Sequence, residues 1–117
     1  MATTTYKILG QVNPVGGVET DLYTVPAATN TVISCISICN SSNSASVSST
    51  NSSKFSITVS KAGAATTSKD YIYNSVSILQ YDTYIANIGM TLDVGDVIRV
   101  YSSNDFLSFN VFGTEIT

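Results

Sequence analysis

The stretch LYTVPAATNTVISCISICNSS, residues 22–42, places a run of apolar and β-branched residues between a proline-containing turn and a tract of Ser and Asn. β-branched residues favour extended backbone, because they pack well on a pleated surface. The stretch therefore predicts one core strand, which ends where the polar tract begins. Two cysteines lie inside this strand, so they are either reactive groups or part of a core.

Cys35 and Cys39 are four residues apart. On a strand, this spacing puts both side chains on one face but about 13 Å apart, at roughly 3.3 Å per residue, which is too far for a disulfide. The sequence has no histidine and no second cysteine pair that could complete a tetrahedral metal site. We therefore expect two small core residues that share a face with Ile33, with a bridge to a neighbouring chain as the alternative. We expect no metal and no cofactor.

The rest of the sequence also has the pattern of short strands. KFSITVS, residues 54–60, and LSFNVF, residues 107–112, both alternate with a period of two, as half-buried strands do. The residues expected on the core side are Phe55, Ile57, Val59, Leu107, Phe109 and Val111. No segment has the apolar stripe of an amphipathic helix. About eight short strands, with turn signals every 8–12 residues or so, predict an all-β fold, an antiparallel β-sandwich or jelly roll.

Size and charge limit the class of protein. A chain of 117 residues is long enough for one modest core, so we expect a single domain over residues 1–117. Charged residues make up only 11% and the formal net charge is −3, so neutral hydroxyl and amide groups must cover the surface. Such a surface favours homo-oligomers and docking on a larger assembly. Five scattered basic residues argue against a nucleic-acid partner.

Targeting signals are not evident. The N-terminal sequence MATTTYKILGQ lacks the basic segment and apolar run of a secretory signal. No apolar stretch approaches the roughly 18 residues of a membrane-spanning helix. We therefore expect a protein made in a cytoplasm, without a membrane partner.

Residues 41–53 form a low-complexity tract of Ser, Asn and Thr. With so few apolar side chains, the tract cannot offset its own ordering entropy through core burial. We expect a loop between two strands, either a mobile tip or a segment that folds against a neighbouring subunit. The glycosylation pattern NSS at Asn40 and Asn51 is a chance match in such a tract.

Catalysis has little support in the sequence. Without histidine, the Ser-His-Asp and Cys-His nucleophile arrangements are excluded. The nearest pair of carboxylates, Asp93 and Asp96, flanks Val94 and Gly95 in TLDVGDVIRV and has the pattern of a tight hairpin turn. We therefore expect that the protein is not an enzyme and has no catalytic residues.

Tyrosines concentrate in the C-terminal half of the chain. A tyrosine buries its ring while its hydroxyl stays in water, which suits a protein interface, a carbohydrate-stacking surface or the rim of a sandwich. Alternation predicts that Tyr71 and Tyr73 share a face. The candidate interface residues are Tyr71, Tyr73, Tyr84, Tyr101 and Phe112.

Five sequence features together resemble a group of small virion structural proteins of tailed bacteriophages, including phages of cyanobacteria. The resemblance extends from Leu9 to Thr117. The features are LYTVPA before the core strand, Asn40 at its end, the KAG turn at residues 61–63, TLDVGDVIRVY at residues 91–101, and FNVFGTEI at residues 109–116. None of them is a catalytic signature.

The resemblance implies an all-β module that is assembled on the particle in the host cytoplasm. Its place would be the tail, its fibres or baseplate, or the capsid surface, and its partners would be other virion proteins. The alternative is an adhesin module of the tail that binds a host receptor or surface glycan. An aromatic-lined groove with converging amides would favour the adhesin, whereas an apolar patch at a subunit contact would favour the structural role.

Overall fold

The computed structural model describes residues 3–42 and 52–117. This part of the chain is built from strands joined by turns and two short 3-10 helices, without an α-helix. The strands are β1 (Thr4–Val12), β2 (Thr20–Thr24), β3 (Asn30–Asn40), β4 (Ser53–Ser60), β5 (Tyr71–Ile78), β6 (Thr83–Ala86), β7 (Met90–Leu92), β8 (Val97–Ser102) and β9 (Leu107–Ile116). The 3-10 helices, η2 (Lys61–Gly63) and η3 (Ser68–Asp70), follow β4.

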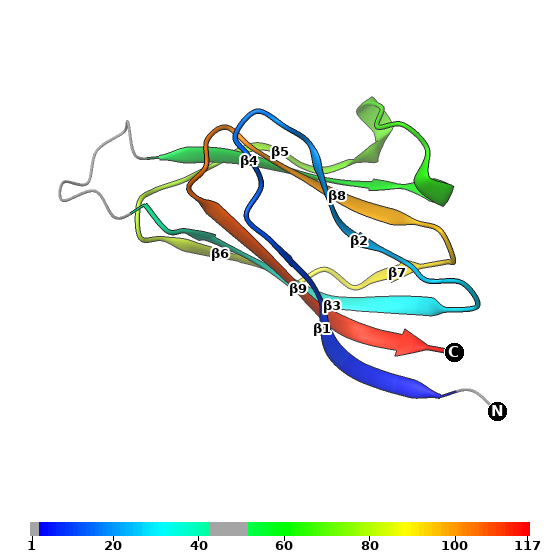
Figure 1. The fold of residues 1–117 in the computed structure, drawn as a ribbon. Helices are drawn as coiled ribbons and strands as arrows, with labels where there is room; N and C mark the ends of the chain where they lie inside the picture. Colours follow the sequence, from blue (N-terminus) through cyan, green and yellow to red (C-terminus); the bar gives the residue numbers. More distant parts are fainter. Residues whose placement is uncertain (1–2, 43–51) are drawn as a thin grey trace.

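The strands form two antiparallel sheets that pack face to face (Figure 1). Sheet A has the order β1-β9-β3-β6, with β7 also paired to β3, and sheet B has the order β2-β8-β4-β5. Since β6 and β7 lie along the same edge of β3, they act as one interrupted strand. Counted in this way, each sheet has four strands, and the chain crosses from one sheet to the other at every connection except the one between β4 and β5. This arrangement confirms the predicted antiparallel β-sandwich of jelly-roll type.

The core lies between the two sheets. Its largest fully buried side chains come from β3, β4, β8 and β9, the inner strands of each sheet. The predicted alternation of residues 107–112 is confirmed, because Leu107, Phe109 and Val111 are buried while the residues between them are half-buried. In β4, Phe55 and Ile57 are buried as predicted. The opposite face, with Ser56, Thr58 and Ser60, is buried too, so β4 is not the half-buried strand that its alternation predicted.

A β-bulge in β3 makes the prediction for the cysteines wrong in part. Ile33 faces Gly113 and Cys35 faces Phe112, so Ser34 is an extra residue that has no opposite partner in β9. The bulge reverses the alternation, because one added residue turns all later side chains to the other face. Ile36 and Ile38 therefore enter the core, whereas Cys35 and Cys39 are half-buried on the outer face of sheet A. Cys35 and Cys39 form no disulfide with each other.

The described ends of the Ser/Asn tract are anchored by buried amides. Asn40 donates a hydrogen bond to the Ile78 carbonyl and accepts one from the Ser42 amide. The Gln80 amide donates to the Ser42 carbonyl, so the end of β3 is held against the β5–β6 connection. Ser53 is already the first residue of β4. The predicted loop conformation of residues 43–51, which include Asn51, lies outside the described residues.

The turn at residues 93–96 joins the two sheets. The Asp96 carboxylate accepts hydrogen bonds from the amides of Asp93 and Ala62, and Gly95 has a φ of 83°. This confirms that both aspartates are turn residues. The expected hairpin was wrong in one respect, since β7 belongs to sheet A and β8 to sheet B, so the strands on either side of the turn do not pair.

Candidate functional site

The predicted interface residues lie in three separate places. Tyr71 and Tyr101 line a groove on the outer face of sheet B. Tyr73 and Tyr84 pack at the margin of the core between the sheets. Phe112 is half-buried on the outer face of sheet A, between Ile8 of β1 and Cys35 of β3. The structure therefore brings together two pairs of the predicted residues but not the whole set.

The predicted common face of Tyr71 and Tyr73 is wrong, again because of a bulge. Thr58 faces Tyr71 and the preceding residue, Ile57, faces Tyr73, so Ile72 is an extra residue in β5. Tyr71 consequently points to the outer side with Thr58, and Tyr73 points inward with Ile57.

The inward pair belongs to an aromatic cluster. The ring centroids of Tyr73 and Tyr84 are 5.6 Å apart, and Phe55 lies 6.1 Å from Tyr73 and 5.5 Å from Tyr84. A hydrogen bond with Tyr84, followed by burial, raises the pKa of Tyr73. Tilted and edge-to-face contacts at these distances are favourable, so this pair contributes to packing between the sheets rather than to an exposed surface.

The outward pair flanks a groove with a cavity volume of about 170 Å³. Both tyrosines are partly exposed. The hydroxyls of Ser56 and Thr58 from β4 line the groove between them. Asn74 and Ser75 of β5, Glu19 from the turn before β2, and Arg99 and Val100 of β8 are the remaining lining residues.

A second bulge in β5 shapes one wall of this groove. Phe55 faces Val76 and Ile57 faces Tyr73, so Ser56 is opposite two residues, Asn74 and Ser75. Ser75 has a φ of 55°, which a non-glycine residue rarely adopts inside a strand. The Ser56 hydroxyl fixes the bulge, since it accepts a hydrogen bond from the Ser75 amide and donates one to Asn74 Oδ1.

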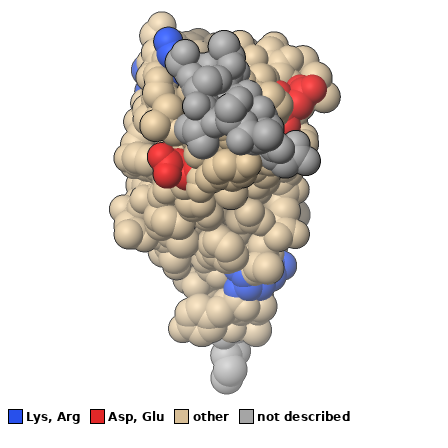
Figure 2. All heavy atoms as spheres, turned by 90° about the vertical axis from the view of Figure 1, so that its left-hand side faces the viewer, with Lys and Arg blue, Asp and Glu red and all other residues tan. Residues whose placement is uncertain are grey.

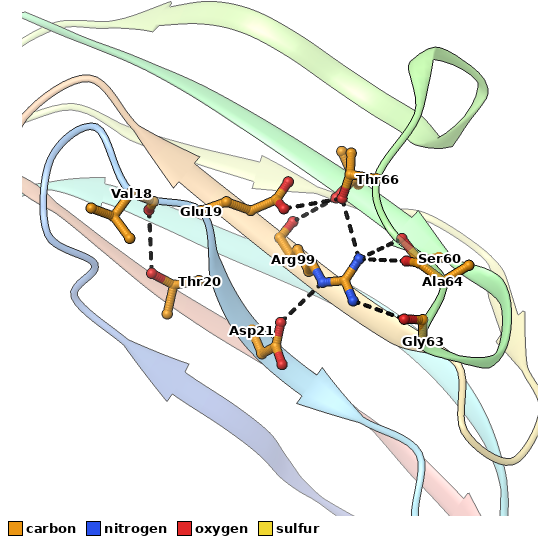
Figure 3. Close-up of polar contacts among 10 residues, drawn as sticks. Val18, Glu19, Thr20, Asp21, Ser60, Gly63, Ala64, Thr66 and Arg99 are labelled. Carbon is orange, nitrogen blue, oxygen red and sulfur yellow. Dashed lines mark hydrogen bonds and ion pairs between the residues drawn. The ribbon is translucent and has the colours of Figure 1, made fainter.

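Arg99 holds the other end of the groove in place. Figure 3 shows its guanidinium between Asp21 of β2 and the segment that follows β4. Nε donates to Asp21 at 3.1 Å, Nη2 donates to the Gly63 carbonyl, and Nη1 donates to Ser60, the Ala64 carbonyl and Thr66. Glu19 accepts a hydrogen bond from Thr66. The cation is therefore paired with Asp21, and its two terminal nitrogens hold residues 60–66 beside the sheet.

Sheet A presents a different kind of surface on its outer face. The register places the following residues outward: Thr4, Tyr6, Ile8 and Gln11 of β1; Asn30, Val32, Cys35, Ser37 and Cys39 of β3; Thr83 and Ile85 of β6; Thr91 of β7; and Ser108, Asn110, Phe112, Thr114 and Ile116 of β9. None of these side chains is charged. Tyr6 is 81% exposed, Ile8 53% and Ile85 52%. This surface, called the sheet A face below, is broad, uncharged and partly apolar.

Charges are sparse elsewhere too. Figure 2 shows the end of the sandwich that lies at the left of Figure 1, and among the described residues in this view few are Lys, Arg, Asp or Glu. In residues 3–42 and 52–117, no cluster of His, Cys, Asp and Glu could hold a metal ion. The same part of the chain contains no helix long and apolar enough to span a membrane.

Sequence reasoning missed the residues that shape the groove. Arg99 is a cation within the otherwise apolar stretch VIRVY, and this pattern could have identified it as a candidate site residue. Asn74 and Ser75 gave no such signal, because a bulge depends on the pairing of two strands and not on one local pattern. No family model matches this chain, and neither does any curated protein.

Proposed function

We propose that this chain is a non-enzymatic structural component of a bacteriophage virion, assembled in several copies on the tail, its fibres or baseplate, or on the capsid surface. The observation that carries the proposal is the sheet A face, where exposed apolar side chains such as Tyr6 and Ile8 occur without any charge. Burial of such a face removes apolar area from water without the desolvation of an ion. The sequence resemblance to virion proteins supports the same role.

The first partner of this face is a second copy of the chain. The net charge is only −3 and the face itself carries no charge, so two copies meet without strong repulsion. Cys35 and Cys39 lie on the same face, so a covalent bridge between neighbours stays a prediction for this contact. Other virion proteins are the wider class of partner.

The fold supports the proposal only by analogy. Jelly rolls build many viral capsid proteins, but the same architecture also occurs in lectins and cupins. The sheet A face and the residues that carry the resemblance are therefore the main support for the proposed role. The carboxylates of Asp93 and Asp96 support a non-enzymatic role, since both accept hydrogen bonds from backbone amides of the turn.

A charge placed on the sheet A face tests the proposal. Ile8→Glu puts a carboxylate at an exposed position, so the fold is expected to persist while copies that meet through this face repel one another. Ile72→Glu is the matched control, since Ile72 is 42% exposed on sheet B. Sedimentation velocity on the purified protein measures self-association of both variants against the unmodified chain.

We expect association by the unmodified chain and by Ile72→Glu, and loss of it in Ile8→Glu. We also expect mass spectrometry to detect the protein in density-purified phage particles. A chain that stays monomeric at all concentrations, or that occurs only in the soluble fraction of infected cells, would overturn the proposal.

A host-receptor or glycan-binding adhesin module of the tail is the second candidate function. The groove between Tyr71 and Tyr101 favours it, because aromatic flanks and converging polar groups are typical of small polar ligand sites. An adhesin on the tail is itself a virion component, so the two functions are compatible.

A further inference from the structure

We infer that the groove between Tyr71 and Tyr101 binds a single ring of a neutral saccharide. This inference rests on the second candidate function, the adhesin, and names its ligand class and its contact residues. It does not depend on association through the sheet A face, since the groove lies on sheet B.

The size of the groove favours one ring over an extended ligand. Its volume is about 170 Å³. Pockets for drug-sized ligands span roughly 300–1,000 Å³. A sugar ring has apolar C–H faces and a rim of hydroxyls, so it suits a slot whose flanks are the partly exposed tyrosines and whose base holds two hydroxyls.

Hydrogen-bonding groups of both kinds line the groove. The Asn74 side-chain oxygen accepts hydrogen bonds from Ser56 and Ser75. Within the described part of the chain, its amide nitrogen makes no hydrogen bond, so it can donate to a ligand hydroxyl. Glu19 accepts from Thr66 through Oε1 at 3.1 Å, which leaves Oε2 as an acceptor. Saccharide hydroxyls both donate and accept, so they match this mixture.

The electrostatics of the groove favour a neutral ligand. Arg99 is the only cation among the lining residues that the structure describes, and Asp21 neutralises it. All three of its nitrogens already donate to protein oxygens. A phosphate or sulfate would therefore find only a cation that Asp21 already pairs, and it would also meet the Glu19 carboxylate.

The strained bulge is a second, independent observation at the same place. Ser75 keeps a φ of 55° in a strand interior, next to Asn74 in the groove wall. Bulges are frequent beside binding sites, where they re-aim side chains, and strained residues persist where the surroundings fix them. Here the bulge is what places Asn74 and Ser75 opposite Ser56 on the groove side.

The test is a titration of the ¹⁵N-labelled full chain with glucose, galactose, mannose and N-acetylglucosamine, each followed by amide chemical shifts. We expect at least one sugar to shift the amides of residues 56–58, 71–75 and 99–101 in a saturable way, with a Kd of about 1 mM or weaker. Tyr71→Ala and Tyr101→Ala should each weaken binding by about two- to tenfold. Tyr71→Phe should retain binding, which separates loss of the ring from misfolding.

Tyr6→Ala is the matched control, because it removes an exposed tyrosine from sheet A and should leave the Kd unchanged. Shifts confined to residues outside the groove, no saturable shift with any of the four sugars, or equal weakening by Tyr6→Ala would each overturn the inference. The proposed assembly is measured separately by sedimentation, so failure of one does not imply failure of the other.

Discussion

The Tyr23 hydroxyl donates a hydrogen bond of 2.6 Å to the Glu115 carboxylate and thereby ties the two sheets together. Tyr23 belongs to β2 of sheet B, and Glu115 belongs to β9 of sheet A. The same hydroxyl lies 2.8 Å from the Thr31 hydroxyl, and Lys7 approaches Glu115 at 2.7 Å. A buried carboxylate is therefore held by one cation and one phenol at this end of the core.

Tyr23→Phe should destabilise the protein by about 1.5–3 kcal/mol, because hydrogen bonds to charged groups contribute about that much. The ring is kept, so packing is little changed. Urea denaturation followed by tyrosine fluorescence or circular dichroism gives the difference in unfolding free energy. Tyr6→Phe, at an exposed tyrosine, serves as the control and should stay within about 0.5 kcal/mol. Equal effects of both substitutions would contradict the role of the Tyr23–Glu115 bond.

The same pair makes stability depend on pH at both extremes. Burial, with the hydrogen bond to Glu115, raises the pKa of Tyr23 from 10.0 to about 12. The folded state then holds this proton more tightly than the unfolded chain does. The contribution of Tyr23 is complete below pH 10 and is lost as the pH rises towards 12.

The contribution of Glu115 to stability changes with pH in the opposite direction. Hydrogen bonds from Lys7 and from Tyr23 lower the pKa of Glu115 below 4.5. Its contribution is therefore present above that value and is lost as the pH falls through the lower, folded pKa. Melting temperature should show a plateau with a decline on each side. Tyr23→Phe should reduce the decline at high pH, and Glu115→Gln should reduce the decline at low pH. Unchanged profiles would contradict the roles of these two residues.

Ile36→Asp should unfold the domain. Ile36 is fully buried between the sheets, so the substitution would leave a carboxylate without a partner in the core. The expected loss is about 4 kcal/mol or more, a large part of the total stability of a typical domain. Ser34→Asp, at the exposed bulge of the same strand, should be tolerated. Melting curves of the two variants provide the measurement, and equal losses would show that the bulge does not define the core face.

Arg99→Lys should loosen the segment after β4. A lysine keeps the charge but cannot reproduce the fork that reaches Asp21, Gly63 and Ala64 at once. We expect a loss of about 1–3 kcal/mol and faster amide hydrogen exchange in residues 61–67. Lys61→Gln is the control, since Lys61 is exposed in the same segment. Exchange rates that stay the same in Arg99→Lys would contradict the anchoring role.

Much of this fold could be predicted from local patterns. Alternation identified residues 107–112 correctly, because β9 pairs with β3 without a bulge there and its inner face meets a continuous core. The turn at Asp93 and Asp96 was also predictable, since aspartates cap backbone amides wherever a turn exposes them. These features depend on a few neighbouring residues.

Bulges account for most of what could not be predicted. An extra residue at Ser34 reversed the face of Cys35, and an extra residue at Ile72 separated Tyr71 from Tyr73. Nothing in the sequence of residues 71–76 indicates which residues of β5 lack a partner of their own in β4. The position of a bulge depends on the fit between both strands. The groove was missed for the same reason. Its tyrosines were candidates, but its polar wall at Asn74 and Ser75 exists only through the bulge.

Substitutions at Ser75 test whether that bulge is strained. Ser75 has a φ of 55°, a conformation that glycine adopts readily and a β-branched residue does not. Ser75→Gly should keep or slightly raise the unfolding free energy, within about 1 kcal/mol, because relief of strain is opposed by the greater freedom of glycine in the unfolded chain. Ser75→Val should lower it by roughly 1–3 kcal/mol. Ser75→Ala separates the backbone effect from loss of the hydroxyl, and it should fall between the two. Urea denaturation of the three variants measures the order, and a glycine variant as unstable as the valine variant would show that the backbone at Ser75 stores no strain.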